Sequence, residues 1–593
     1  MRRQAATFVW RAALAAALVC GIGLLPWLTR TDPALTVLKA RSADRDPTPE
    51  VLADIRAQLG LGDGPLRLLG QWLGGLWRGD AGRSWISGDE VTPAVLQALG
   101  ASLLLMAVAL VVAVVTAGLV CARTLRLGAH RRLDGRRTAG SGSAVLAALP
   151  EFLTASVLAT VVGVQLGWLP ALGWYGPQWT VLPALALGLP AGAVIGRLLD
   201  DLLPGAFAEP WALAAAARGL PGRSIARQAV RRCLPGLLPN LGLFVVGLTG
   251  GSVAVEQIFD IPGLGRTTLQ AALAQDLPVL QAGTLLLILL AAAAAGLAAL
   301  ATRRLAGPAL RDGALSSLHR PQPPTRGIPT FVHGGLLILV IALGLPRDPL
   351  ALDTTRRLQP PSWTQPFGTD ALGRDMLARV AHGALDTLLL ALAIGIVALV
   401  AGALLGLVAR VSGPLVDTVN AVPPVLAALL VTSVAGSGAA TPALAVGVVA
   451  WAPLAAHTSA LLRQERAALH VTATRGLGAG RWYLLRRELL PAVLPPVTRH
   501  ALLRLPGIAL ALASLAFLGL GAQPPSPEWG LLLAENQPYA ERAPWAVLAP
   551  AAVLALLGAL AVSAAGGIRR ARPRTSATLA ERPSLTRELV ETG

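Results

Sequence analysis

The chain has 593 residues, of which 54% are hydrophobic and only 14% are charged, and its mean hydropathy is +0.61. Water-soluble domains carry about 25% charged residues, so this composition excludes a soluble protein and predicts an all-α polytopic membrane protein. The formal net charge of +18 lies largely in arginine-rich loops between apolar runs. That pattern is typical of cytoplasmic loops and not of a nucleic-acid-binding face. We therefore expect membrane lipid around the chain and no nucleic-acid partner.

The first apolar run covers about residues 8–28 and follows a basic start. It is either a cleavable signal peptide or a retained membrane span. Because no small-x-small cleavage site closes the run, we favour a retained span with a cytoplasmic N-terminus. Residues 30–97 are polar enough to lie outside the membrane, and within them Thr48 and Pro49 predict the start of a helix that Gly60 ends.

Five further apolar runs complete a first set of six spans, at about residues 102–120, 145–166, 181–195, 241–255 and 280–300. A membrane-crossing helix needs roughly 20 residues, and Pro190 is expected to break the fourth span. Between the fourth and fifth spans, residues 197–236 are arginine-rich and therefore cytoplasmic. Residues 1–305 thus form a first unit, whose outer segment is about 30–97.

The pattern restarts after a Pro- and Arg-rich linker at residues 306–328. A second unit, 329–568, has six spans at about residues 331–345, 388–408, 422–435, 444–462, 502–520 and 545–564. It repeats the organisation of the first unit, with an outer segment at 347–386 and a basic loop at 463–499. A basic tail, 569–593, follows. Twelve spans predict that both termini are cytoplasmic.

This internal repeat is typical of transport proteins. The chain has no G-x-x-x-x-G-K-[ST] phosphate loop and no H-E-x-x-H, C-x-x-C or G-x-S-x-G motif, and its three cysteines and seven histidines are dispersed. We therefore expect no catalytic residue, no metal site and no directly bound cofactor. A membrane-embedded enzyme would need a nucleophile or a metal set. A twelve-span ion-coupled carrier would bury carboxylates in its spans, and acidic residues are scarce at the span centres. Energy from a separate ATPase is thus favoured.

Several motifs occur in the order in which one known family has them. They are RAQLGL at 56–61, GDAGRS at 79–84, GGSVAVEQIF at 250–259, PGLG at 262–265, PFGTDALGRD at 366–375 and FLGLGAQPP at 517–525. On these motifs the chain resembles the two permease subunits of a bacterial ATP-binding-cassette importer of the dipeptide, oligopeptide and nickel class, fused head to tail. Residues 8–305 resemble the first subunit and residues 330–568 resemble the second.

The resemblance implies two type I importer permease units of six helices each, in the bacterial inner membrane. It also implies alternating access, two ATPase domains that use ATP at the cytoplasmic face, and an extracytoplasmic solute-binding protein. The implied substrates are di- and oligopeptides, with nickel or nickel chelates as the alternative. The scarcity of histidine favours peptides.

The two basic loops match the segment through which this family contacts its ATPases, and their alternative reading is a plain cytoplasmic loop. Coupling residues implied by the resemblance are Ala215, Arg218, Gly219, Ala473, Arg475, Gly478, Leu490 and Pro491. Three departures from the family occur in the second half, where Glu488 replaces a histidine and Leu512 and Ala516 replace an acid and a serine. Because Ala216 stands at the family's arginine position in the first loop, we expect the second loop to be the main ATPase contact.

A second set of residues is implied at the outer mouth of the pathway and in gating. It comprises Glu256, Pro262, Gly263, Gly265, Gly368, Asp370, Arg374, Asp375, Gly519 and Gly521. Glu256 is either an interfacial carboxylate or part of a gate. Asp370 is expected to cap a helix and to pair weakly with Arg374 four residues later.

Overall fold

The computed structural model describes residues 2–29, 32–41, 46–133, 141–311, 328–420, 422–436, 438 and 440–567. Over these ranges the chain forms no β-strand, and extended pairing is limited to two isolated bridges, Arg83 with Glu90 and Thr369 with Asp375. The predicted all-α class is confirmed for this part of the chain. Most of the predicted linker and the whole predicted tail lie outside the described residues.

Seven helical segments of the described chain are long and apolar enough to cross a membrane: Val91–Ala129, Pro177–Phe207, Leu277–Ala301, Met376–Leu407, Thr441–Arg466, Arg481–Phe517 and Pro544–Ala564. Four shorter apolar helices, Ala12–Gly23, Glu151–Gln165, Thr330–Gly344 and Pro424–Ala435, lie at the predicted first, third, seventh and ninth spans. The predicted fifth span belongs to one long helix, Gly222–Ile258. Helices therefore lie at all twelve predicted spans.

The first unit begins with a span and an outer helical hairpin. Its helices are α1 (Arg2–Gly23), α2 (Leu25–Leu28), α3 (Pro33–Arg41), α4 (Pro49–Gln58), α5 (Pro65–Trp77), α6 (Val91–Ala129), α7 (Ser141–Leu146), α8 (Glu151–Leu158), α9 (Val181–Phe207), α10 (Pro210–Ala217), α11 (Gly222–Ile258), α12 (Leu264–Ala274) and α13 (Leu277–Arg311). The predicted start of α4 is confirmed, because the Thr48 hydroxyl accepts the Val51 amide and Gly60 adopts φ +67° after the helix.

The second unit repeats this order with a shorter outer segment. Its helices are α14 (Ile328–Gly344), α15 (Met376–Leu407), α16 (Ala409–Asn420), α17 (Pro424–Ala435), α18 (Thr441–Arg466), α19 (Leu469–Gly476), α20 (Arg481–Tyr483), α21 (Leu490–Phe517), α22 (Trp529–Asn536) and α23 (Pro544–Gly567). A π-helical segment, Leu484–Leu489, joins α20 to α21.

The central helix pair of each unit packs through glycine. In the first unit a Cβ at Gly188 or Gly192 of α9 would lie 2.6 or 2.4 Å from a backbone oxygen of α6. In the second unit a Cβ at Gly402 or Gly406 of α15 would lie 2.6 or 2.5 Å from a side-chain Cβ of α18. Membrane helices associate through such small residues because backbones can then approach closely. The internal repeat therefore extends to helix packing.

One expectation about the spans is wrong. Pro190 does not break the fourth span, since α9 continues through both Pro190 and Pro204. Pro190 is buried within the helix bundle, and tertiary packing offsets the lost helical hydrogen bond. The break falls in the third span, where α7 ends at Leu146 and α8 starts at Glu151 after Pro150.

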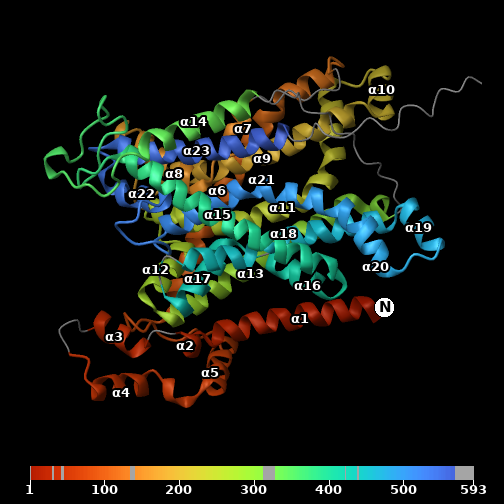
Figure 1. Cartoon of the computed structure of the whole chain (residues 1–593). Helices are drawn as coiled ribbons and strands as arrows, with labels where there is room; N and C mark the ends of the chain where they lie inside the picture. Colours follow the sequence, from red (N-terminus) through yellow and green to blue (C-terminus); the bar gives the residue numbers. More distant parts are fainter. Residues whose placement is uncertain are drawn as a thin grey trace, which may run out of the picture.

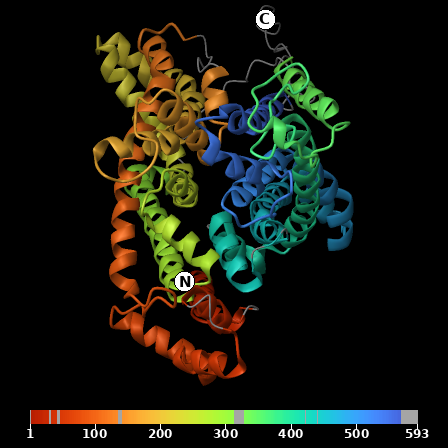
Figure 2. The ribbon, with the colours of Figure 1, turned by 90° about the vertical axis from the view of Figure 1, so that its left-hand side faces the viewer.

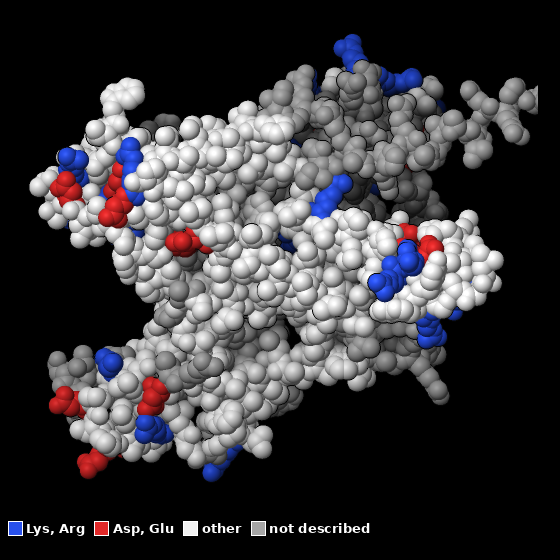
Figure 3. Space-filling view, viewed as in Figure 1, with Lys and Arg blue, Asp and Glu red and all other residues white. Residues whose placement is uncertain are grey.

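The long axes of the spans run between two ends of the molecule (Figure 1). At one end lie α10, α19 and α20, and at the other lie α12, α22 and the hairpin formed by α3 and α4. On the face in Figure 3, most described charges gather toward the two ends, and the surface between them is largely uncharged. This distribution agrees with a membrane-embedded middle and places both basic loops on one side.

The two units lie side by side, as seen along the spans in Figure 2. They share one hydrophobic core, which includes Leu153 and Ala254 of the first unit and Leu429 and Leu515 of the second. Polar contacts also join them, since Ser156 Oγ donates to Gln537 Oε1 at 2.6 Å. The chain therefore forms one body with a contact surface between its repeats.

Candidate functional site

A cavity of about 830 Å³ lies between the two units. Its wall comes from α8 and α11 on one side and from α17, α18 and α21 on the other. The lining is mostly apolar, glycine or proline, and its polar side chains are Glu151, Asn420, Arg504 and Ser514. Small-molecule sites typically occupy roughly 300–1,000 Å³ and combine apolar walls with a few polar groups. This cavity is the candidate site on the translocation pathway.

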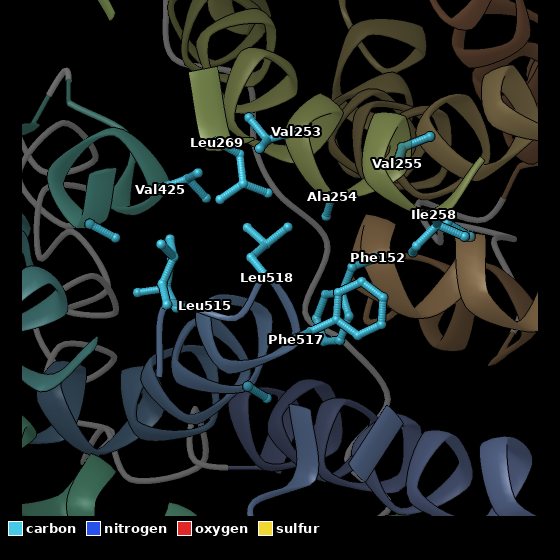
Figure 4. Packing of buried hydrophobic residues seen from close by; sticks show 14 of the residues in the cluster. Phe152, Val253, Ala254, Val255, Ile258, Leu269, Val425, Leu515, Phe517 and Leu518 are labelled. Carbon is cyan, nitrogen blue, oxygen red and sulfur yellow. The ribbon is translucent and has the colours of Figure 1, made fainter. Parts of the chain in front are cut away.

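Buried apolar side chains from both units pack together beside the cavity, and we call this group the apolar plug (Figure 4). The rings of Phe152 and Phe517 lie 5.9 Å apart, and they come from different units. Around them pack Val253, Ala254 and Leu269 of the first unit, and Val425, Leu515 and Leu518 of the second. Phe517 ends α21 and Leu269 belongs to the outer helix α12, so the plug lies on the outer side of the cavity.

Glu256 is fully buried beneath the outer mouth of the first unit. Its Oε1 accepts a hydrogen bond from Ser102 Oγ at 2.7 Å, and its Oε2 accepts one from the Arg266 amide at 2.9 Å. The Leu264 amide donates to Ser102 Oγ at 2.8 Å. The carboxylate thus fastens the N-terminus of α12 to α11 and α6, and it is not interfacial.

The two predicted glycines beside Glu256 make room for that carboxylate. A Cβ at Gly263 would lie 2.3 Å from the Glu256 carboxyl carbon, and one at Gly265 would lie 2.8 Å from Val253 Cγ2. Pro262 is exposed and precedes them in the turn. These residues are brought together as a cap for α12, and their part in gating stays a prediction.

The predicted outer residues of the second unit form a compact turn. Asp370 Oδ1 accepts the amides of Leu372 and Arg374, each at 2.9 Å, and its Oδ2 accepts Arg374 Nε at 2.7 Å. The expectation that Asp370 caps a helix is wrong, because the cap of α15 is Asp375, whose Oδ1 accepts the Leu377 amide at 2.8 Å. Its pair with Arg374 is present, but both side chains are buried, so the pair is not a weak surface contact.

Arg379 and Glu535, which were not predicted as site residues from the sequence, complete this cluster. The Arg379 side chain has no solvent exposure, and its Nη1 lies 2.9 Å from Asp370 Oδ2 and 2.9 Å from Glu535 Oε2. Its Nη2 donates to the Ser526 carbonyl at 3.3 Å. An arginine in the first turn of an apolar span is unusual, and that signal was present in the sequence.

The first unit has a simpler contact at the equivalent place. Ser84 Oγ donates to Asp276, and the Trp85 amide donates to Asp276 Oδ1 at 3.1 Å. Asp276 is buried and directly precedes α13. Ser84 stands inside the motif at 79–84, but sequence reasoning gave neither Ser84 nor Asp276 a role. Each outer segment is therefore fastened to its own unit by a buried carboxylate.

Glycines shape the turn after α21 and the turn before α15. Gly519 has φ +77° and Gly368 has φ +70°, a region that favours glycine. A Cβ at Gly521 would lie 2.9 Å from the Ala516 Cα, and one at Gly368 would lie 2.6 Å from the Gln359 carbonyl oxygen. The backbone therefore requires glycine at these predicted positions.

The two candidate coupling segments, α10 and α19, end in the same backbone turn. The Gly219 amide donates to Ala216 O at 3.0 Å, and the Gly478 amide donates to Arg475 O at 3.1 Å. Gly219 has φ +74° and Gly478 has φ +93°. Ala216 therefore occupies the same position in the first turn that Arg475 occupies in the second turn.

The side chains of the two segments differ. The α19–α20 surface exposes Leu469, Leu477, Trp482 and Tyr483 at 87%, 89%, 70% and 53%. The α10 surface exposes Leu213 and Leu220 at 48% and 38%. Ala473, Arg475, Arg218 and Pro491 are exposed, whereas Ala215 is buried and Leu490 is half-buried at the start of α21.

Each segment is attached to its spans through a small apolar cluster. Val471 of α19 packs with Leu462 of α18 and Val493 of α21. On α10, the partly buried Trp211 packs against a cluster that contains Leu203 and Ala229. Glu209, which precedes α10, also pairs with Arg232 of α11 at 2.7 Å. Each segment is therefore packed directly against its neighbouring spans.

The chain belongs to the family described as binding-protein-dependent transport system inner membrane component, which it matches twice, at residues 114–311 and 391–572. The two matches fall in the two units, so the chain carries two permease units and the predicted resemblance is confirmed. Members of this family form the membrane part of ATP-binding-cassette importers, which work with ATPase and substrate-binding partners.

Curated relatives each cover part of the chain. The di/tripeptide transport system permease protein DppC of Pseudomonas aeruginosa is 36% identical over 250 residues, or 38% of this chain and 82% of the relative. The probable D,D-dipeptide transport system permease protein DdpC of Escherichia coli is 31% identical over 253 residues, or 38% and 84%. The metal-staphylopine import system permease protein CntB of Staphylococcus aureus is 30% identical over 291 residues, or 49% and 92%.

Proposed function

We propose that this chain forms the translocation pathway of an inner-membrane ATP-binding-cassette importer for di- and oligopeptides. The observation that carries the proposal is a cavity between two permease units, with an apolar plug on its outer side and the candidate coupling segments at the opposite end of the molecule. Two of the relatives described above carry dipeptide transport in their names, which supports the substrate class.

Transport proceeds by alternating access. With the plug closed, the cavity faces the cytoplasm, and separation of Phe152 from Phe517 opens it outward. The plug residues come from both units, so movement of one unit against the other opens or closes the pathway.

The partners act at the two ends. Two ATPase domains bind α10 and the α19–α20 surface and use ATP, and the chain itself has no ATPase activity and binds no cofactor. A solute-binding protein docks on the outer segments 30–97, 347–386 and 521–544. Both termini are cytoplasmic, which agrees with the position of the N-terminal end of α1 on the side of α19 in Figure 1.

Uptake by proteoliposomes tests the substrate and the energy source together. The chain is reconstituted with its ATPase and binding-protein partners, and uptake of labelled dipeptides is compared with uptake of ⁶³Ni²⁺, free or chelated. We expect ATP-dependent peptide uptake. ATP-dependent nickel uptake without peptide uptake would favour the alternative that the metal-staphylopine relative suggests. Uptake by the chain alone with an ion gradient would instead favour a secondary carrier.

Substitution of Gly478 tests the coupling segment. Gly478→Ala places a Cβ on a residue at φ +93°, which costs about 1 kcal/mol or more and distorts the end of α19. We expect loss of transport with normal membrane insertion, and the same result for Arg475→Ala. Gly476→Ala, inside α19 with open space around it, is the matched control. Unchanged uptake by both variants, with ATPase subunits still bound, contradicts the coupling role.

A further inference from the structure

Two side chains of opposite charge line the otherwise weakly polar cavity, and each comes from a different unit. Glu151 is the first residue of α8, and Arg504 lies in the middle of α21. At a rise of 1.5 Å per residue, Arg504 is about 20 Å along α21 from Phe517 of the plug. Glu151, by contrast, is the neighbour of Phe152 in the plug. The two charges therefore lie at different depths of the pathway.

Neither charge is neutralised by the described part of the chain. Within it, Glu151 and Arg504 form no ion pair and no hydrogen bond with another side chain. Both side chains are partly buried. Leaving a charge unpaired away from bulk water costs free energy, which a ligand of opposite charge recovers. The cavity therefore offers one site for a negatively charged group, at Arg504, and one site for a positively charged group, at Glu151.

Burial disfavours both charges, and each has a local feature that offsets part of this cost. The N-terminus of α8 stabilises a carboxylate at Glu151 through its free amides. Gly251 of α11 faces the same carboxyl group, and a Cβ there would lie 3.1 Å from its carbon. A guanidinium remains charged at every physiological pH and offers a planar pair of donors to a carboxylate.

We infer that the cavity binds a zwitterionic substrate by its two ends, with Arg504 pairing with the substrate carboxylate and Glu151 with its ammonium group. This inference rests on the proposed import function and adds a selectivity step within the membrane. Because the two groups belong to different units, a bound zwitterion bridges the units, and their separation during transport releases it.

The test compares trialanine with free termini, its N-acetylated form and its C-terminal amide. Import is measured in proteoliposomes that contain the full chain with its ATPase and binding-protein partners, and each variant is expressed relative to wild type. Arg504→Gln should lower import of the free and N-acetylated peptides about tenfold and leave the amide unchanged. Glu151→Gln should lower import of the free peptide and the amide about tenfold and leave the N-acetylated form unchanged. Because the binding protein is the same in every sample, a change in these import ratios reflects the substitution in the membrane chain.

Two controls separate the site from general damage. Arg504→Lys keeps the charge and should retain part of the selectivity. Arg499→Gln removes a half-buried arginine of the same helix that does not line this cavity, and it should leave the ratios among the three peptides unchanged. Equal loss for all three peptides, or no change for any of them, overturns the inference.

A second measurement decides the inference if the reconstituted complex imports no peptide, which by itself would contradict the proposed function. Binding of the three peptides to the full chain in lipid nanodiscs is followed by saturation-transfer NMR. Binding of the free peptide that Arg504→Gln and Glu151→Gln each weaken about tenfold supports the cavity site. Absence of binding by the wild-type chain overturns it.

Discussion

At the scale of single residues, buried charge decides the shape of the outer mouth. Asp370, Arg374, Arg379 and Glu535 form one cluster in which a single Arg379 nitrogen faces two carboxylates. Removing one partner from such a cluster leaves other charges buried and unpaired. The cluster therefore holds the turn before α15 against α22.

Arg379→Met should destabilise the protein by about 3–5 kcal/mol, because Asp370 and Glu535 would share only Arg374. The free energy of unfolding is measured with denaturant in detergent micelles. The control is Arg356→Gln, which removes an exposed pair with Asp353 and should cost less than about 1 kcal/mol. Equal stability of Arg379→Met and wild type would show that the cluster adds nothing.

Glu528 gives the outer mouth a pH dependence. It accepts the amides of Gly530 and Leu531, each at 3.1 Å, as the N-cap of α22, but desolvation by burial raises its pKa from 4.5 to about 7. The folded protein therefore binds this proton more tightly than the unfolded chain does. Stability contributed by the protonated form is complete below about pH 4.5 and is lost as the pH rises toward 7, by about 3 kcal/mol.

Glu528→Gln should remove this loss, since an amide oxygen can still accept both backbone hydrogen bonds. The melting temperature in nanodiscs is recorded between pH 4 and pH 8 for both proteins. The wild type should fall relative to the variant as the pH rises, and the exposed Glu541→Gln should follow the wild type. Parallel curves for Glu528→Gln and wild type would contradict the raised pKa.

At the scale of helices, α10 and α19 end in the same backbone turn but expose different side chains. Both end in a turn with glycine at positive φ, and the arginine position is filled only in α19. The larger exposed apolar surface also belongs to α19–α20. The α19 segment is therefore better equipped to hold an ATPase.

Arg475→Ala should weaken binding of the ATPase subunits about tenfold, as expected for the loss of one charged hydrogen bond. Adding Ala216→Arg to that variant should recover part of the affinity through α10, because the two turns have the same backbone. Retention of ATPase on the immobilised chain is measured against rising salt. Ala217→Arg, next to the turn position, is the control for added charge. If Ala217→Arg recovers as much as Ala216→Arg, the position itself has no role.

At the scale of the whole molecule, the two units meet at the plug. Phe152 and Phe517 are buried and their contact crosses the boundary between the repeats. The same boundary contains the cavity. We therefore propose that the relative position of the units controls access to the cavity.

Phe152→Ala with Phe517→Ala should open the outer closure. A cysteine placed at Ser514, which lines the cavity, is treated from outside with a membrane-impermeant thiol reagent, with the native cysteines replaced by alanine. We expect labelling at least about tenfold faster than with both phenylalanines present. Phe331→Ala, on the lipid-facing surface of α14, is the matched control. Unchanged labelling would show that other residues close the pathway.

The sequence predicted the arrangement of the units and part of the candidate site. Hydropathy located the twelve spans, and motifs located the turns at Gly263, Gly368, Gly478 and Gly519. It missed Arg379, Glu535 and the cavity charges Glu151 and Arg504, because their roles depend on residues far away in the chain. The prediction of a break at Pro190 was wrong, since the effect of a proline inside a helix depends on its tertiary packing, and Pro190 is buried.

By itself the sequence determined an all-α membrane protein of two repeated permease units, because hydropathy, arginine placement and glycine turns act locally along the chain. Only the tertiary structure decided which charges are buried together, where the cavity lies and what closes it. Those features arise from contacts between helices of different units, and a linear pattern does not specify the distances between them.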